Sequence, residues 1–145
     1  MQLYAMVLEA RASAWAEFKK CRAKGQAGFR KDFRTTDQVF IIQTLIKQAK
    51  HAKRKLYCCF LDFKKAFDLL PRETLWRTLE QRGMKGKVLT SLQTMYAADE
   101  ACVLTPNGPT DLFDCSIGVK QGCPASPLLF GLYVDELEKL LEDSS

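Results

Sequence analysis

The sequence predicts an α+β fold that is mostly helical, with a short antiparallel sheet and one β-hairpin. Three observations predict this class. Several segments repeat apolar residues at helical spacing, one short apolar run lies mid-chain, and two alternating segments flank a turn rich in Pro and Gly. The 145 residues are 47% hydrophobic, which suits one domain and excludes a disordered tail. No apolar run approaches the roughly 20 residues of a membrane span, so we expect no membrane contact.

The first part of the chain is expected to hold two helices joined by a basic loop. Apolar residues at helical spacing predict an amphipathic helix over residues 3–21, and residues 24–34 form a loop with two glycines. Thr35-Thr36-Asp37-Gln38 has the form of a capping box, a hydroxyl followed three residues later by Gln. The helix that it opens carries one apolar face, made by Ile42, Leu45, Ile46 and Ala49.

The middle of the chain is expected to alternate a strand with helices. Residues 56–60 form a nearly continuous apolar run, which predicts a buried strand ending near Asp62. A short helix is expected over residues 66–69. Pro71 suits the first turn of the next helix, which should stop at Gly83, and a further helix is predicted over residues 87–98.

The last part is expected to hold the hairpin and a final helix. Alternation over residues 101–105 and 111–117 predicts two strands around the turn at 106–109. Residues 118–125 read as a loop. Ser126 is expected to cap a helix that has Pro127 in its first turn and runs to Leu141, with the carboxylates at 135 and 136 on its solvated face.

The formal net charge of +5 is unevenly distributed. Basic residues dominate residues 1–56, in clusters at 19–34 and 47–55, whereas acidic residues exceed basic ones over 57–145. A polyanionic partner and a merely solvated basic face explain this equally well. The six cysteines contain no C-x-x-C pair and only one histidine accompanies them, which argues against zinc and favours reduced thiols in an intracellular protein.

Two segments could carry chemistry. Asp62 stands at the end of the predicted strand, where a carboxylate can hold a divalent cation, or cap the helix that follows. Residues 118–127, GVKQGCPASP, place two glycines, an amide and a lysine before a helix N-terminus, where backbone N–H groups can face an anion. The alternative is a tight turn without a ligand.

These two segments, taken in order with residues 26–30 and 35–38, resemble reverse transcriptases of non-LTR (LINE-type) retrotransposons. Residues 60–68, FLDFKKAFD, look like that family's first catalytic motif, and residues 118–127 like its second palm motif. The resemblance implies a partial right-hand polymerase fold. Residues 1–56 and about 100–117 would be fingers-like, and residues 57–99 and 118–145 palm-like.

The resemblance also implies roles for individual residues. Asp62 matches the catalytic, metal-binding aspartate, with the backbone carbonyl of Phe63 as a further ligand. Three residues match the nucleotide-binding positions: Phe67, Gln121 and Gly122. Four match nucleic-acid-binding positions: Arg30, Lys31, Arg34 and Lys120. Asp68 belongs to the first motif, and we expect it to have a structural role, capping or pairing nearby.

One part of the family pattern is missing. The aromatic-x-Asp-Asp motif, which supplies further carboxylates, does not occur in the sequence. We therefore expect Mg²⁺, or Mn²⁺, to bind only if those carboxylates are supplied, and the chain alone not to polymerise. In the parent enzyme the partners would be an RNA template, a DNA primer and a dNTP, without an obligate protein partner, and the location nuclear. The alternative is a non-catalytic nucleic-acid-binding remnant or a module retained by a host.

Overall fold

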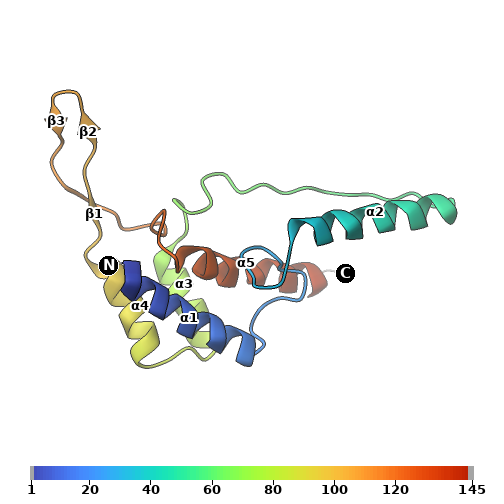
Figure 1. Ribbon diagram of the computed structural model, residues 1–145, viewed down its shortest axis with the longest axis horizontal. Helices are drawn as coiled ribbons and strands as arrows, with labels where there is room; N and C mark the ends of the chain where they lie inside the picture. Colours follow the sequence, from blue (N-terminus) through green and yellow to red (C-terminus); the bar gives the residue numbers. More distant parts are fainter. Residues whose placement is uncertain (1, 144–145) are drawn as a thin grey trace.

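The computed structural model describes residues 2–143, apart from the side chains at 139 and 142. Within that range there are five helices and four two-residue strands (Figure 1). The helices are α1 (Gln2–Phe18), α2 (Thr35–His51), α3 (Arg72–Gln81), α4 (Lys87–Ala97) and α5 (Ser126–Asp143). The strands are β1 (Glu100–Ala101), β2 (Leu104–Thr105), β3 (Gly108–Pro109) and β4 (Phe113–Asp114). None of the described helices is long and apolar enough to cross a membrane.

The hydrophobic core lies where α1, α3, α4 and α5 pack together. Its centre consists of fully buried leucines from α3, α4 and α5, namely Leu75, Leu79, Leu92, Leu129 and Leu132. Burying each such side chain contributes about 1.5–3 kcal/mol. Helix α1 contributes Leu8 with the small residues Ala12 and Ala16, so it can approach α4 closely. The helix predicted over residues 3–21 is confirmed, although it ends at Phe18, and two of its large apolar residues, Tyr4 and Phe18, are exposed.

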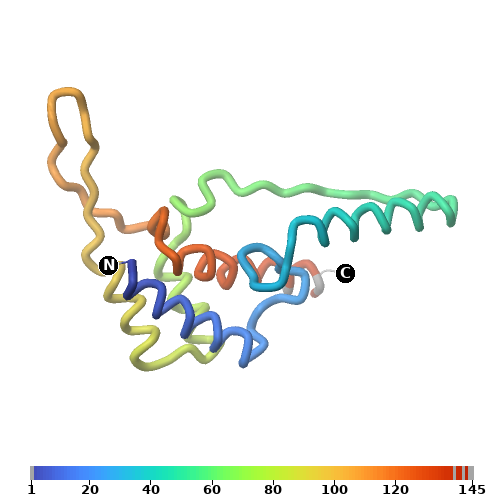
Figure 2. Tube along the Cα trace, in the orientation of Figure 1, coloured from blue at the N-terminus to red at the C-terminus, as the bar shows by residue number. Residues whose placement is uncertain are grey.

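Helix α2 projects away from this four-helix core, and no residue of α2 is buried. Figure 2 shows the chain turning at the end of α2 and running back in an extended trace toward α3. The helix begins at Thr35 with Arg34 as its cap, so both lie one residue earlier than the predicted capping box implies. The carboxylate of Asp37 accepts a hydrogen bond of 3.1 Å from the backbone N–H of Arg34. The negative charge in this first turn also suits the helix dipole.

The predicted hairpin is confirmed as an antiparallel ribbon built from two short ladders. Strand β2 pairs with β3, with Thr105 opposite Gly108, so that Pro106 and Asn107 form a two-residue turn. Strand β1 pairs with β4, with Glu100 opposite Asp114. The regular pairing is shorter than predicted, and Gly108 and Pro109, which were predicted to lie in the turn, form β3. Between the two ladders, Thr110 is hydrogen-bonded to the backbone of Val103.

The predicted buried strand at residues 56–60 is wrong. These residues have no strand pairing, and Tyr57 and Phe60 are 84% and 82% exposed. An apolar run becomes a buried strand only if another strand bonds its edge and another layer covers its face. No described part of the chain does either, so the segment is extended but solvated. The coarse class, mixed helix with small antiparallel sheets, is confirmed, while the division into fingers-like and palm-like parts stays a prediction.

Three local expectations are also wrong. Residues 66–69 form turns in place of a short helix, with Lys65 at φ 51°. Pro71 precedes α3 in an extended conformation and does not lie within its first turn. Ser126 is the first residue of α5, and its hydroxyl donates to the carbonyl of Lys120 and does not cap the helix. Next to residues 66–69, backbone hydrogen bonds from Gly118 and Val119 to Leu70 and Phe67 replace the local signal, whereas Ser126 bonds a carbonyl only six residues earlier in the chain.

Candidate functional site

The two motif segments lie against each other although about fifty residues separate them in the sequence. The backbone N–H of Val119 donates to the carbonyl of Phe67 at 2.7 Å, and that of Gly118 donates to Leu70 at 2.8 Å. The side-chain amide of Gln121 donates to the carboxylate of Asp68 at 2.7 Å. These three bonds fix the loop before α5 to the end of the first motif. Asp68 pairs nearby, as predicted.

Gly118 is required at this junction. Its φ is +82°, and a Cβ at this position would lie 2.6 Å from the carbonyl oxygen of Asp68 and 2.9 Å from that of Phe67. No side chain can occupy that space, and the backbone conformation itself disfavours any residue other than glycine. The absence of a side chain is therefore what lets the two segments make their backbone hydrogen bonds.

Gly122 lies four residues further on and is open to solvent. Its φ is +79°, but nothing lies within 4 Å of the place where a Cβ would stand. It borders a pocket of about 460 Å³, which lies within the range of small-molecule sites. The lining residues come from both motifs and from the start of α5: Phe67, Lys120, Gln121, Gly122, Cys123, Pro124, Ser126 and Pro127.

An aromatic cluster holds Phe67 at the edge of this pocket. The centre of the Phe67 ring lies 5.2 Å from the centre of the Phe130 ring on α5 and 6.2 Å from that of the Phe29 ring in the basic loop. Phe63 contacts Phe130 edge-on at 6.0 Å. Such pairs each stabilise the structure by about 0.5–1.5 kcal/mol beyond the area that they bury. The cluster thus joins the basic loop, the first motif and α5 around one ring.

Arg72 holds the same loop from the start of α3, and this role was not predicted from the sequence. Its guanidinium is buried at the start of α3 and donates to the carbonyl oxygens of Gly118 (2.6 Å), Tyr96 (3.2 Å) and Cys115 (2.5 Å). It also forms an ion pair of 2.5 Å with Asp99. The partners lie 24 to 46 residues away in the chain. No local pattern could therefore have identified this role, although an arginine directly after Pro71 was visible.

Lys120, which was predicted to bind nucleic acid, is engaged within the chain. Its ammonium group lies 3.0 Å from the carboxylate of Asp99 and 5.7 Å from the centre of the Tyr96 ring. The hydroxyl of Tyr96 lies 3.2 Å from that of Ser126, and burial raises the pKa of Tyr96 above its ordinary value. Lys120 still lines the pocket, where its charge is partly neutralised.

Asp62, the predicted metal ligand, lies in the solvated extended segment. It is exposed, forms no hydrogen bond or ion pair with any described residue, and does not line the pocket beside Phe67. Among the side chains that the structure describes, no three of metal-binding type come together. A two-metal site needs several carboxylates, which hold the two metal ions about 3.5–4 Å apart. The residues present therefore do not fit a two-metal site, and Asp62 with the carbonyl of Phe63 stays a prediction.

The other three predicted nucleic-acid contacts lie in or beside the basic loop. Arg30 forms an ion pair of 2.8 Å with Glu17 on α1 and stacks 4.7 Å from the centre of the Phe33 ring. Its hydrogen bond lowers the pKa of Glu17. Lys31 and Arg34 are exposed and have no ion pair with described residues. Arg30 therefore serves first to hold the loop on α1.

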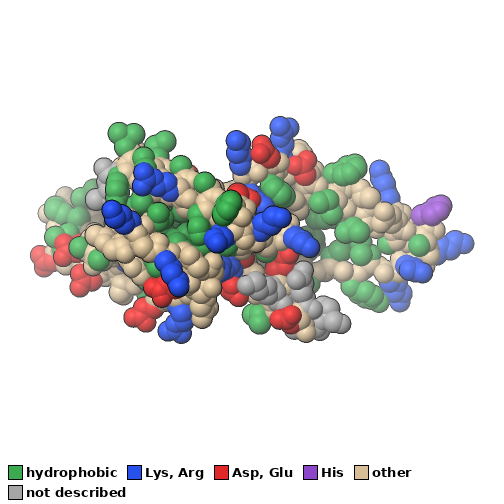
Figure 3. Space-filling view, turned by 90° about the horizontal axis from the view of Figure 1, so that it is seen from below, with side chains coloured by type: hydrophobic (Ala, Val, Ile, Leu, Met, Phe, Trp, Pro, Cys, Tyr) green, Lys and Arg blue, Asp and Glu red, His purple; other side chains and the backbone are tan. Residues whose placement is uncertain are grey.

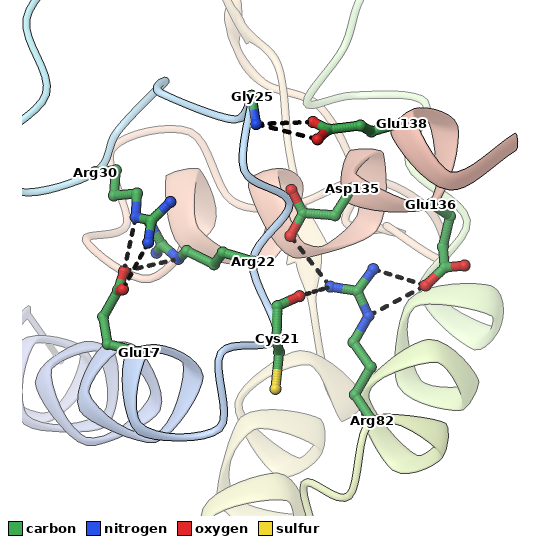
Figure 4. Close-up of polar contacts among 9 residues, drawn as sticks. All are labelled: Glu17, Cys21, Arg22, Gly25, Arg30, Arg82, Asp135, Glu136 and Glu138. Carbon is green, nitrogen blue, oxygen red and sulfur yellow. Dashed lines mark hydrogen bonds and ion pairs between the residues drawn. The ribbon is translucent and has the colours of Figure 1, made fainter. Parts of the chain in front are cut away.

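A second set of polar contacts fastens the basic loop to α3 and α5 (Figure 4). Arg82 donates to the carbonyl of Cys21 at 3.0 Å, and it pairs with Asp135 at 3.1 Å and Glu136 at 2.7 Å. The backbone N–H of Gly25 donates to Glu138. The prediction that Asp135 is solvated is wrong: it is only 2% exposed, and burial raises its pKa although the bond from Arg82 opposes the shift.

Comparisons with known proteins identify the family of the chain. The profile of the family described as reverse transcriptase (RNA-dependent DNA polymerase) matches residues 9–145. The chain is 29% identical over 116 residues to the retrovirus-related Pol polyprotein from type-2 retrotransposable element R2DM of Drosophila melanogaster, covering 80% of this chain and 11% of the relative. It is 33% identical over 105 residues to the transposon TX1 uncharacterized 149 kDa protein of Xenopus laevis, covering 72% and 8%.

A Pol polyprotein from type-1 retrotransposable element R2 of Nasonia vitripennis is 25% identical over 72% of this chain and 10% of its own length. The chain thus spans about a tenth of the length of these curated relatives. Because the family profile covers nearly every residue, the match does not depend on one motif. The chain therefore belongs to the reverse transcriptase family, as a part of the reverse transcriptase of a non-LTR retrotransposon.

Proposed function

We propose that this chain is the part of an RNA-directed DNA polymerase that receives the incoming nucleotide. The observation that carries the proposal is the junction of the two motifs. Bonds from Gly118, Val119 and Gln121 place the loop beside Phe67, and the pocket of about 460 Å³ opens between them. A pocket of that volume, with an aromatic ring, an amide and a partly neutralised lysine at its edges, suits a nucleoside triphosphate.

Each predicted nucleotide-binding residue has a place in this proposal. Phe67 presents a ring, held by Phe130, on which the sugar of the nucleotide can lie. Gly122 leaves the space that a Cβ would fill, so that the ligand can approach the backbone. Gln121 is turned toward Asp68, and that hydrogen bond fixes the amide at the rim of the pocket. Lys120 adds positive charge for the phosphates.

The nucleotide site can be tested with a fluorescent dATP analogue, mant-dATP, titrated against the purified chain. We expect Gly122→Ala to weaken binding about tenfold or more, because the new methyl group occupies the ligand's approach. Gly83→Ala is the matched control. Gly83 also has a positive φ (+89°) with nothing within 4 Å of the place where a Cβ would stand, but it follows α3 and does not line the pocket. Equal affinities of the two variants would contradict the proposal.

We further propose that the chain by itself does not extend a primer. Asp62 is a single exposed carboxylate, and Mg²⁺ or Mn²⁺ held by it and the carbonyl of Phe63 would need further carboxylates from a longer protein. The full enzyme would act on an RNA template, a DNA primer and a dNTP. Primer extension by the purified chain on an RNA template, abolished by Asp62→Ala, would overturn this part of the proposal.

A second candidate, a non-catalytic module that only binds nucleic acid, is favoured by one observation. Lys31 and Arg34 are exposed cations without ion pairs among the described residues. Salt-sensitive binding of RNA together with no binding of mant-dATP would favour this module over the polymerase part.

A further inference from the structure

All of the chain's formal net charge can be assigned to one projecting element. Five of the 22 Lys and Arg residues lie in residues 38–61, which contain no Asp or Glu. The remaining 17 basic residues equal the chain's 17 acidic residues in number. The five cations are at the C-terminal end of α2 and in the turn after it, and with His51 they form what we call the basic tip: Lys47, Lys50, Lys53, Arg54 and Lys55.

The basic tip is exposed and has no internal counter-charge. Every one of its five cations is exposed, and none forms an ion pair with a described residue. Figure 3 shows its Lys, Arg and His side chains grouped at one end of the molecule, without acidic side chains among them on the face in view. Arg30 and Lys120, by contrast, are held by Glu17 and Asp99. The tip therefore offers a group of exposed, unneutralised positive charges in a stretch of chain without acidic residues.

The turn after α2 is closed by its own backbone hydrogen bonds. The N–H of Arg54 donates to the carbonyl of Ala49 at 2.9 Å, and that of Lys53 donates to Lys50 at 3.1 Å. Lys53 has a φ of 50°, in the left-handed conformation that usually belongs to glycine at this place after a helix. The sequence thus keeps a cation where glycine would be less strained. The closed turn holds the cations around the helix end.

We propose that the basic tip binds the phosphodiester backbone of a nucleic acid, at a place separate from the nucleotide pocket. The site itself follows from charge and shape, and only the choice of nucleic acid as the anion rests on the proposed function. Contacts of this kind are sequence-independent and salt-sensitive. They would hold a strand that leads toward or away from the pocket, because α2 projects from the core that carries the pocket.

An anionic membrane is a different class of partner, and the order of residues along α2 argues against it. Helices that lie on membranes carry their cations beside the apolar face along the same length. In α2 the large apolar residues end at Ile46, and the first Lys or Arg of the helix is Lys47, so that only the small Ala49 lies among the cations. The apolar part and the charged part follow each other, so a helix lying flat would not place its cations along the apolar face.

The test compares binding of labelled single-stranded RNA, DNA of the same sequence and the hybrid duplex as salt is varied. The variant Lys50→Gln/Lys53→Gly/Arg54→Gln removes three charges and leaves the turn a residue that favours its conformation. We expect the slope of log K against log salt to fall by about 2 to 3, which corresponds to a loss of about 100-fold in affinity near roughly 0.1 M salt. The three probes show whether the strand is RNA, DNA or both.

The matched control removes the same number of charges elsewhere, as Arg77→Gln/Lys85→Gln/Lys87→Gln. All three side chains are exposed around α3 and α4 and have no ion pair with described residues. An unchanged slope in this control supports the proposal. An equal loss in both variants would overturn it, because binding would then follow net charge alone.

Two further measurements, of binding to anionic vesicles and to mant-dATP, separate the tip proposal from a membrane site and from the nucleotide site. Tighter binding to phosphatidylserine vesicles than to any of the nucleic acids would overturn the proposal. Binding of mant-dATP should be unchanged in the tip variant. If mant-dATP binds neither protein while RNA binding still depends on the tip, the tip proposal stands and the nucleotide site fails. If mant-dATP binds both and the tip variant keeps its RNA affinity, the tip proposal fails alone.

Discussion

Substitution of Gly118 tests whether the contact between the two motifs is a requirement of the fold. In Gly118→Ala the new Cβ would stand 2.6 Å from the carbonyl oxygen of Asp68, a backbone atom that no side-chain movement can displace. The left-handed conformation alone costs about 1–2 kcal/mol. Shifting the segment also breaks one or both backbone hydrogen bonds to residues 67 and 70, at about 1–3 kcal/mol for each buried group left unpaired. We expect a loss of about 3–5 kcal/mol.

Gly122→Ala separates the two parts of that loss. Gly122 has nearly the same φ but nothing within 4 Å, so only the conformational cost of about 1–2 kcal/mol applies. Urea unfolding followed by circular dichroism gives the free energy of unfolding of both variants. Against a typical total of about 5–15 kcal/mol, a difference of 2 kcal/mol or more is readily measured. Equal losses in the two variants would refute the reasoning, because the close approach at Gly118 would then carry no energy.

Three other perturbations have defined outcomes. Arg72→Met should lower the free energy of unfolding by about 3–5 kcal/mol, since it leaves buried carbonyls and a carboxylate without their partner. Arg77→Met on the same helix is the control and should change stability little. Urea unfolding curves of the two variants that coincide would contradict this prediction. Lys53→Gly should raise stability by about 1 kcal/mol and the melting temperature by about 2–4 °C, and a lower melting temperature would show that the turn is not strained. Glu17→Gln should lower the free energy of unfolding by under about 1 kcal/mol near neutral pH, because the hydrogen bond from Arg30 lowers the pKa of Glu17. This stabilisation of the unmutated chain is lost as the pH falls below 4.5 and through the lowered pKa. A stability difference between the two proteins that grows on acidification would contradict the ion pair.

The helices could be predicted from the sequence because their signals are local. Apolar spacing found the helices, and glycines marked the end of α3 and the loop before α5. The hairpin was found from Pro106, Asn107 and Gly108 between alternating segments. Each of these signals depends on residues within one or two turns of chain, which fold in the same way whatever lies elsewhere.

Three of the failures depend on distant partners. The apolar run at 56–60 looks buried by composition, yet burial requires a neighbouring strand and a covering layer. Asp135 looks solvated among the acidic residues of α5, yet Arg82 reaches it from α3. The role of Arg72 is set by carbonyl groups far along the chain.

The candidate site was predictable only in part. The resemblance identified the two motif segments, and the structure brings residues 67 and 118–127 together. The resemblance could not distinguish the two glycines of the loop. At Gly118 the missing side chain lets the backbone of residues 67 and 68 approach closely, whereas at Gly122 it leaves space at the pocket. The difference depends on which atoms of distant segments lie next to each glycine, and the sequence of the loop alone does not predict this.

The nucleotide pocket is tested most directly by nuclear magnetic resonance of the ¹⁵N-labelled chain titrated with dATP. We expect the amide signals of Phe67 and of residues 120–123 to shift together and to saturate with one binding constant. Shifts confined to the basic tip would show that the triphosphate is held by charge alone. That result, or an unchanged spectrum around Gly122, would contradict a nucleotide site at this pocket.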